Sequence, residues 1–280
     1  MMLAANSMAV FAQEGTPAPE QTADPREEAA DAAAAEGTTE SEAHELADFP
    51  TLLRALAESS KPSWSDYYRP PIKPRSDRSL GAIALGGVMA DIYLATEGYD
   101  ERQVKNLGME VEAHSRILGI NEGIGGEVRV LSETAGAENW EDVRKAIKAL
   151  DDKIEELLVK QRDTDLASLM EVGFWLRGLE VASGVIQADE EAKNLSLCVG
   201  CPKRLQQLAT TLEGLEEATR EQPLVVELEA EVGRLVRRWD DPEEGYNRED
   251  VDASHTKIRN LLRRIFETKA PKPPEEGGSS

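Results

Sequence analysis

The sequence predicts an all-α protein, a multi-helix bundle with a disordered acidic N-terminal tail and a short disordered C-terminal tail. Two observations lead to this fold class. Aromatic residues make up 5% and charged residues 31% of the 280 residues, and long stretches rich in Leu, Ala, Glu, Lys and Arg favour helix over sheet. Every long apolar pattern repeats with the helical period, and none alternates as a strand does.

Residues 1–12 resemble the end of a secretory signal. Small residues, Val10 and Ala12, stand three and one positions before Gln13, as at a cleavage site, but a basic start is missing. The segment is either a truncated signal or a plain apolar tail, and we favour the signal. We therefore expect a periplasmic or secreted protein. No cysteine follows the apolar stretch, which excludes a lipid anchor at that site.

Both ends of the chain have the composition of disordered segments. Residues 13–48 contain eleven acidic residues, with Arg26 as the only base, and almost no large apolar side chain. Such a linker cannot bury enough surface to offset the entropy of ordering it. The proline-rich and glycine-rich residues 269–280 form a second tail of this kind.

Residues 49–79 combine a short helix with a segment in which four prolines forbid a regular helix. Trp64, Tyr67 and Tyr68 make this segment too apolar for a free linker. We expect an extended strap laid across the helices. A proline-rich ligand for another protein is the alternative, but a clean PxxP pattern is missing.

Residues 80–268 form the predicted helical domain. The run from Leu80 to Thr96 carries one charge, Asp91, and is slightly short for a membrane span, so we expect a buried core helix and no transmembrane span. Gly119 ends the next helix, residues 119–126 predict a glycine-rich turn, and a short helix follows around residues 126–135. Asn139 caps the start of one amphipathic helix, and Pro223 is the first residue of another.

Two segments of this domain are similar to each other. Residues 85–96, LGGVMADIYLAT, align with residues 172–183, VGFWLRGLEVAS, so that Gly86 pairs with Gly173 and Thr96 with Ser183. The match suggests two duplicated helical units around two central helices, whose glycines permit close approach. A match this short also arises by chance between apolar helices.

The same two segments resemble a group of uncharacterised exported all-helical proteins from bacteria, over about residues 80–186. In that group a Gly-x-x-x-Ala-Asp-type helix is followed by a Gly-Trp-type helix. This chain departs from the pattern at Arg177 and Glu180, and the cysteine pair is not part of it. The resemblance implies an exported helical domain and no activity.

Asp91 and Arg177 are the odd charges in the two apolar helices. A buried ion pair that sets the register of the helices is the structural interpretation, and we prefer it. The functional interpretation is an acid in a pocket with His114 as its partner. With Tyr93 and Trp175, these residues make up a possible buried polar or ligand site. His114 and His255 each occupy an apolar stripe position, where we expect a hydrogen bond to a carbonyl or an acid.

Cys198 and Cys201, in LSLCVGCPKR, are the only cysteines. Pro202 suits the first turn of a helix, which would place Cys201 at a helix cap beside Lys203 and Arg204 and lower its thiol pKa. Redox motifs of this spacing, however, lie in βαβ settings, and the neighbours here are helical. We rank a local disulfide first, free buried thiols second and a working redox pair third.

The sequence contains no phosphate loop, nucleophile elbow or dinucleotide fingerprint, and we expect no metal and no cofactor. The net charge of −22 argues against nucleic acid as a partner. We therefore expect an exported, non-enzymatic helical module that binds a protein or a cell-envelope component. The alternatives are a thiol–disulfide exchange protein and a carrier of a small ligand between the central helices.

Overall fold

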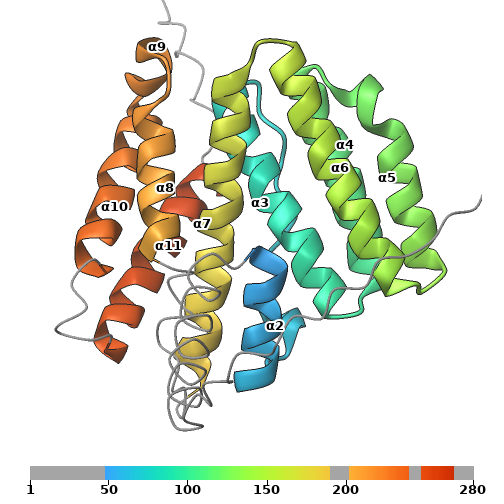
Figure 1. Ribbon diagram of the computed structural model, residues 1–280, viewed down its shortest axis with the longest axis horizontal. Coiled ribbons are helices and arrows are strands. Elements are labelled where there is room, and N and C mark those ends of the chain that lie inside the picture. The colour runs from blue at the N-terminus through green and yellow to red at the C-terminus, as the bar shows by residue number, and fades with distance from the viewer. Residues whose placement is uncertain (1–47, 190–201, 240–246, 268–280) are drawn as a thin grey trace, which may run out of the picture. The chain divides into compact units, whose positions relative to one another are not determined.

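The computed structural model describes residues 48–189, 202–239 and 247–267, and every regular element among them is helical (Figure 1). The prediction of an all-α, multi-helix fold is confirmed. In chain order the elements are α2 (Phe49–Ser60), the 3-10 helix η1 (Trp64–Tyr67), α3 (Arg78–Glu97), α4 (Glu101–Leu118), α5 (Asn121–Gly136), α6 (Trp140–Lys160), α7 (Thr164–Ala188), α8 (Pro202–Glu213), α9 (Glu217–Arg220), α10 (Pro223–Trp239) and α11 (Arg248–Glu267).

Several sequence predictions concern residues outside the described ranges. These are the signal-like segment 1–12, the acidic linker up to residue 47, both cysteines, Cys198 and Cys201, and the tail 269–280. They stay predictions.

Helices α3 and α7 form the centre of the described chain and pack against each other more extensively than any other pair of helices in it. They run in the same direction, with α4, α5 and α6 on one side and α8, α10 and α11 on the other (Figure 1). Both central helices are apolar around most of their circumference, because neighbours cover them on several sides.

Helix α3 is the one helix among the described residues with the length and hydropathy of a membrane span. Its mean hydropathy is 1.5, and 89% of the span is buried against other parts of the protein. A core helix of this length has the same composition, and this burial is what the sequence led us to expect of residues 80–96.

The two central helices cross at the pair of glycines that the internal alignment equates. A Cβ atom on Gly86 would lie 1.9 Å from the carbonyl oxygen of Met170, and a Cβ atom on Gly173 would lie 2.0 Å from that of Ile83. The contact is therefore reciprocal: each glycine packs against a backbone carbonyl one helical turn before the glycine of the other helix. The predicted close approach is confirmed.

A second pair of aligned residues also behaves alike. The Thr96 hydroxyl donates to the Ile92 carbonyl at 2.8 Å, and the Ser183 hydroxyl donates to the Leu179 carbonyl at 2.6 Å. The two central helices thus share local geometry at both ends of the aligned segment. Their common origin stays a prediction.

The predicted turn at residues 119–126 is wrong. Gly119 does end α4 in the left-handed conformation, with φ at 75°, but α5 begins at Asn121 and contains the following glycines. One of them has a packing role, since a Cβ atom on Gly123 would lie 2.6 Å from the Leu157 side chain of α6. Gly123, one of the glycines that suggested a turn, instead allows α5 and α6 to approach each other.

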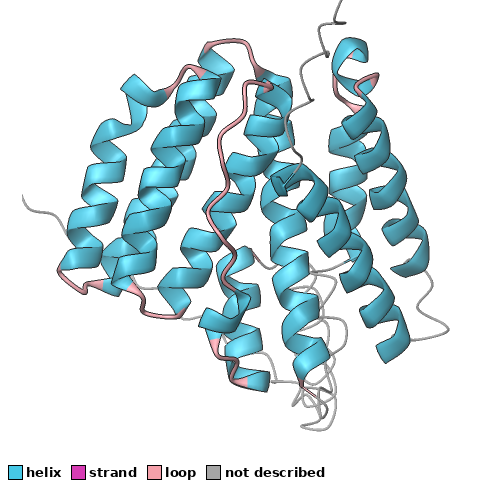
Figure 2. Cartoon of the chain, turned by 180° about the vertical axis from the view of Figure 1, so that it is seen from behind, coloured by secondary structure: helices cyan, strands magenta, loops and turns pink. Residues whose placement is uncertain are grey.

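Residues 61–77 form the strap, which follows α2 and runs along the helices to the start of α3 (Figure 2). Trp64 and Ile72 are buried, and Tyr67 and Tyr68 pack half-buried against the core. The expected strap is present; it is extended after Tyr67, whereas Trp64–Tyr67 form the 3-10 helix η1. Asp77 ends it by accepting a hydrogen bond from the Leu80 backbone amide at 2.9 Å, which caps α3.

Candidate functional site: a groove beside a buried ionic network

Asp91 and Arg177 form an ion pair between the central helices, as the structural interpretation of these charges predicted. The Arg177 Nε atom donates to Asp91 Oδ1 at 2.8 Å, and both side chains are about 95% buried. The other guanidinium nitrogens donate to Glu180 Oε2, at 2.6 Å, and to the Tyr67 carbonyl of the strap. Burial lowers the pKa of Arg177, but the nearby carboxylates outweigh it and raise the pKa overall.

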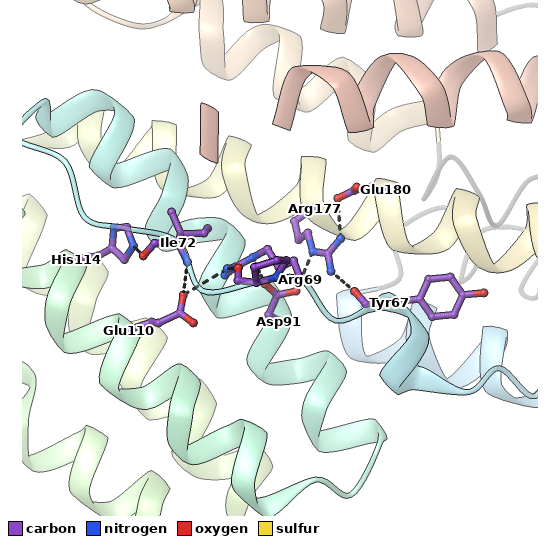
Figure 3. Close-up of polar contacts among 9 residues, drawn as sticks. Tyr67, Arg69, Ile72, Asp91, Glu110, His114, Arg177 and Glu180 are labelled. Atoms are coloured by element: carbon purple, nitrogen blue, oxygen red, sulfur yellow. Dashed lines mark hydrogen bonds and ion pairs between the residues drawn. The ribbon is translucent and has the colours of Figure 1, made fainter. Parts of the chain in front are cut away.

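A second arginine reaches the same carboxylate from the strap (Figure 3). Arg69 Nε lies 2.5 Å from Asp91 Oδ2, although the two atoms are not aligned as a hydrogen bond. Arg69 Nη1 donates to Glu110 Oε2 of α4 at 3.3 Å and to the Pro70 carbonyl at 2.9 Å. Asp91 therefore joins α3 to both α7 and the strap.

Two side chains of α4 hold the next part of the strap. Glu110 Oε2 accepts a hydrogen bond from the Ile72 backbone amide at 3.1 Å, while His114 Nε2 lies 3.3 Å from the Ile72 carbonyl. A carbonyl oxygen only accepts, so Nε2 carries the proton in this contact. The expected hydrogen bond from His114 to a carbonyl is confirmed.

The same surroundings keep His114 neutral. Its Nδ1 atom is buried and has no hydrogen-bond partner among the described residues. Burial lowers the pKa of His114 to about 4, the hydrogen bond to Ile72 opposes that shift, and the Arg69 charge adds to it. Burial also raises the pKa of Glu110, and Arg69 offsets part of that rise.

Burying charges costs free energy, and good geometry between opposite charges returns roughly that amount, so such a network adds little net stability. Its partners show what it does instead. The carboxylates of Asp91 and Glu110, and the side chains of Arg177 and His114, all contact strap residues. We define these four residues with Arg69 and Glu180 as the buried ionic network, which fixes the strap to three helices.

Beside the network lies a groove with a volume of about 880 Å³. The strap forms one wall, α11 the other and α7 the floor. The groove is lined by Asp66, Tyr67, Tyr68, Arg69, Pro70 and Pro71 of the strap, by Arg177 and Glu180 of α7, and by His255, Thr256, Arg259, Asn260, Arg263 and Phe266 of α11, among others.

The α11 wall carries two arginines that are free to meet a ligand. Arg259 and Arg263 are exposed, and neither forms an ion pair with any residue in the described part of the chain. By contrast, Arg264 of the same helix pairs with Glu227 on another face. The groove thus places unpaired positive charge in a chain whose net charge is −22.

A serine of α7 and a histidine of α11 contact each other where the two helices pack together. His255 Nδ1 lies 3.0 Å from Ser183 Oγ and 3.2 Å from the Glu180 carbonyl, as expected for a histidine at the core edge. Ser183 is fully buried, and its hydroxyl already donates to Leu179. This arrangement suits the attachment of α11 to α7 and not nucleophilic attack, which needs an accessible hydroxyl.

The remaining predicted site residues lie elsewhere. Tyr93 and Trp175 belong to an aromatic cluster, in which Phe49 of α2 stands edge-on to Tyr93, Phe174 and Trp175 at 5.1–6.1 Å between ring centroids. Of the five residues grouped from the sequence, only Arg177 lines the groove, and Asp91 lies directly behind it.

Sequence reasoning missed Arg69, Glu110 and Glu180 as partners of the central charges, and also missed Arg259 and Arg263. One signal pointed to Arg69, because a charged residue next to the apolar Tyr67 and Tyr68 in a strap would need a partner. In the part of the chain that the structure describes, no three His, Cys, Asp or Glu side chains gather as metal ligands.

No family model, curated protein or solved structure matches the chain.

Proposed function

We propose that the protein is a non-enzymatic, exported binding module, and that the groove between the strap, α7 and α11 holds an extended segment of a partner protein. The observation that carries this proposal is the groove itself. Aromatic and proline side chains of the strap line it together with the unpaired arginines of α11.

The size of the groove supports a short peptide segment. Its α11 wall runs from His255 to Phe266, which corresponds to roughly 16 Å of helix. An extended peptide of about five residues has that length. Tyrosine, phenylalanine and arginine side chains, which line this groove, are also the residue types enriched where proteins bind each other.

The fixed strap supports the same proposal. A wall held at Tyr67, Arg69 and Ile72 by buried partners needs little ordering when a ligand binds, so less binding free energy is lost. Export belongs to the proposal through the signal-like residues 1–12.

The test is a selection of random heptapeptides displayed on phage against the full chain, followed by affinity measurements on synthetic copies of the enriched peptides. A variant with the groove filled, Thr256→Trp with Asn260→Trp, should lose binding. Both positions are exposed on the α11 wall, so the core stays intact.

The matched control is Met109→Trp with Val226→Trp, which adds two tryptophans at exposed helix positions outside the groove. It should bind like the unaltered chain. The proposal fails if no peptide is enriched, or if enriched peptides bind the groove-filled variant equally well.

A further inference from the structure

We infer that the partner segment is acidic, with carboxylates at alternate positions on either side of an apolar residue. This inference rests on the proposed function and adds the chemistry of the ligand. Two features of the groove support it: the spacing of Arg259 and Arg263 on α11, and the aromatic and proline side chains of the strap.

The two arginines lie one helical turn apart on the groove side of α11. Four residues of helix rise about 6 Å. In an extended peptide, the side chains of alternate residues point to the same face and lie about 7 Å apart. Carboxylates in a Glu-x-Glu pattern therefore match the two guanidinium groups in register, and arginine binds carboxylate with two parallel hydrogen bonds.

The residue between the two carboxylates points to the opposite face of such a peptide, toward the strap wall. That wall presents the half-buried Tyr67 and Tyr68 rings and the exposed Pro70 and Pro71. An apolar or aromatic side chain packs well there. The groove thus favours an acidic–apolar–acidic sequence over a run of adjacent acids.

Of the arginines that line the groove, Arg259 and Arg263 are the ones available to bind the carboxylates of the ligand. Arg177 and Arg69 also line the groove, but their guanidinium groups face Asp91, Glu180 and Glu110. Asp66 is an exposed acid on the strap side of the groove and would repel a carboxylate there. The acidic side chains of the ligand therefore face α11 and the apolar one faces the strap.

The experiment measures the binding of three fluorescein-labelled peptides to the full chain by fluorescence anisotropy. They are Ser-Glu-Phe-Glu-Ser, its rearrangement Ser-Glu-Glu-Phe-Ser, and the neutral Ser-Gln-Phe-Gln-Ser. We expect the first to bind about tenfold more tightly than the neutral peptide, as two exposed charge pairs allow, and also more tightly than the rearranged one.

Charge reversal identifies the arginines. Arg259→Glu with Arg263→Glu should remove this preference, whereas Arg102→Glu with Arg237→Glu should keep it. The control arginines are likewise exposed, lie outside the groove and form no ion pair within the described residues, so both variants change the net charge equally. Circular dichroism checks that both variants fold.

Three outcomes would overturn the inference: equal binding of the acidic and neutral peptides, equal loss in both arginine variants, or displacement of the first peptide by inorganic phosphate at equal charge concentration. If display-selected neutral peptides still require an open groove, the proposed function stands and only the acidic ligand is wrong. If filling the groove has no effect on any peptide, the proposed function itself fails.

Discussion

At the scale of single residues, Asp91 shows how a buried charge can organise a larger structure. Its two oxygens face arginines from different parts of the chain, Arg177 of α7 and Arg69 of the strap. Both arginine side chains are largely buried, so water could not replace the Asp91 carboxylate if it were removed. The three side chains therefore depend on one another.

Asp91→Asn should destabilise the protein by about 3 kcal/mol, because removing one partner of a buried ion pair leaves the other charge uncompensated. Urea unfolding measures the change. Glu231→Gln, which breaks the more exposed pair with Arg234 on α10, should cost less than about 1 kcal/mol. Equal effects of the two substitutions would contradict the assignment of a buried network.

His114 should make stability depend on pH. Its folded-state pKa of about 4 lies below the ordinary 6.5, so its contribution to stability is complete above pH 6.5 and is lost as the pH falls toward 4. The loss is at most about 3 kcal/mol. Glu110, whose pKa is raised, acts in the opposite direction.

His114→Gln isolates the histidine, since glutamine can donate to the same Ile72 carbonyl but does not titrate. The variant should lose less stability than the unaltered chain between pH 6.5 and 4, as measured by urea unfolding at several pH values. Parallel pH profiles for the two proteins would show that His114 is not buried as described.

At the scale of elements, the crossing of α3 and α7 depends on the absence of two side chains. Gly86 and Gly173 each place bare backbone against the backbone of the other helix. Gly125 and Gly126 of α5 have no such role, since a Cβ atom on either would meet no atom of a neighbouring element within 4 Å. Alanine substitutions at Gly125 and Gly126 can therefore serve as controls for the same substitutions at Gly86 and Gly173.

Gly86→Ala or Gly173→Ala should destabilise the protein by more than about 3 kcal/mol, because the helices must move apart along their longest contact. Gly125→Ala and Gly126→Ala should stabilise it by about 0.5–1 kcal/mol, as alanine is the better helix former. Thermal unfolding of the four variants measures both signs. Destabilisation of similar size at all four positions would contradict the crossing.

The elements themselves follow from local patterns. Apolar stripes and caps such as Gly119 and Asn139 depend on nearby residues, so they predict helices without knowledge of the fold. The error at Gly123 has a non-local cause. Whether a glycine makes a turn or makes room for another helix depends on Leu157, which is distant in sequence.

The site is less predictable for the same reason. Asp91 and Arg177 stand out because a charge is rare in an apolar helix. Glu110 borders the apolar stripe of α4, and Arg259 and Arg263 lie on the exposed face of α11, where charges are common in amphipathic helices and carry no signal. Only the packing of the strap and α11 against α7 gives these residues a role.

At the scale of the whole molecule, the core is connected to the groove through the strap. The buried ionic network fixes the strap, and the strap is one wall of the groove. The net charge of −22 would repel an acidic partner at long range, but charges farther than about 8 Å are largely screened at physiological salt. Contacts within the groove then decide the binding.

The central claim is that the network holds the groove in its binding shape. The most direct test is the affinity of a display-selected peptide for the unaltered chain, for Asp91→Asn and for Ile154→Ala, at a temperature where all three are folded. Ile154 is buried in α6 and does not line the groove, and its truncation should cost a comparable 2–5 kcal/mol of stability. We predict weaker binding by Asp91→Asn alone; equal affinities for all three proteins, or equal losses in both variants, would contradict the account.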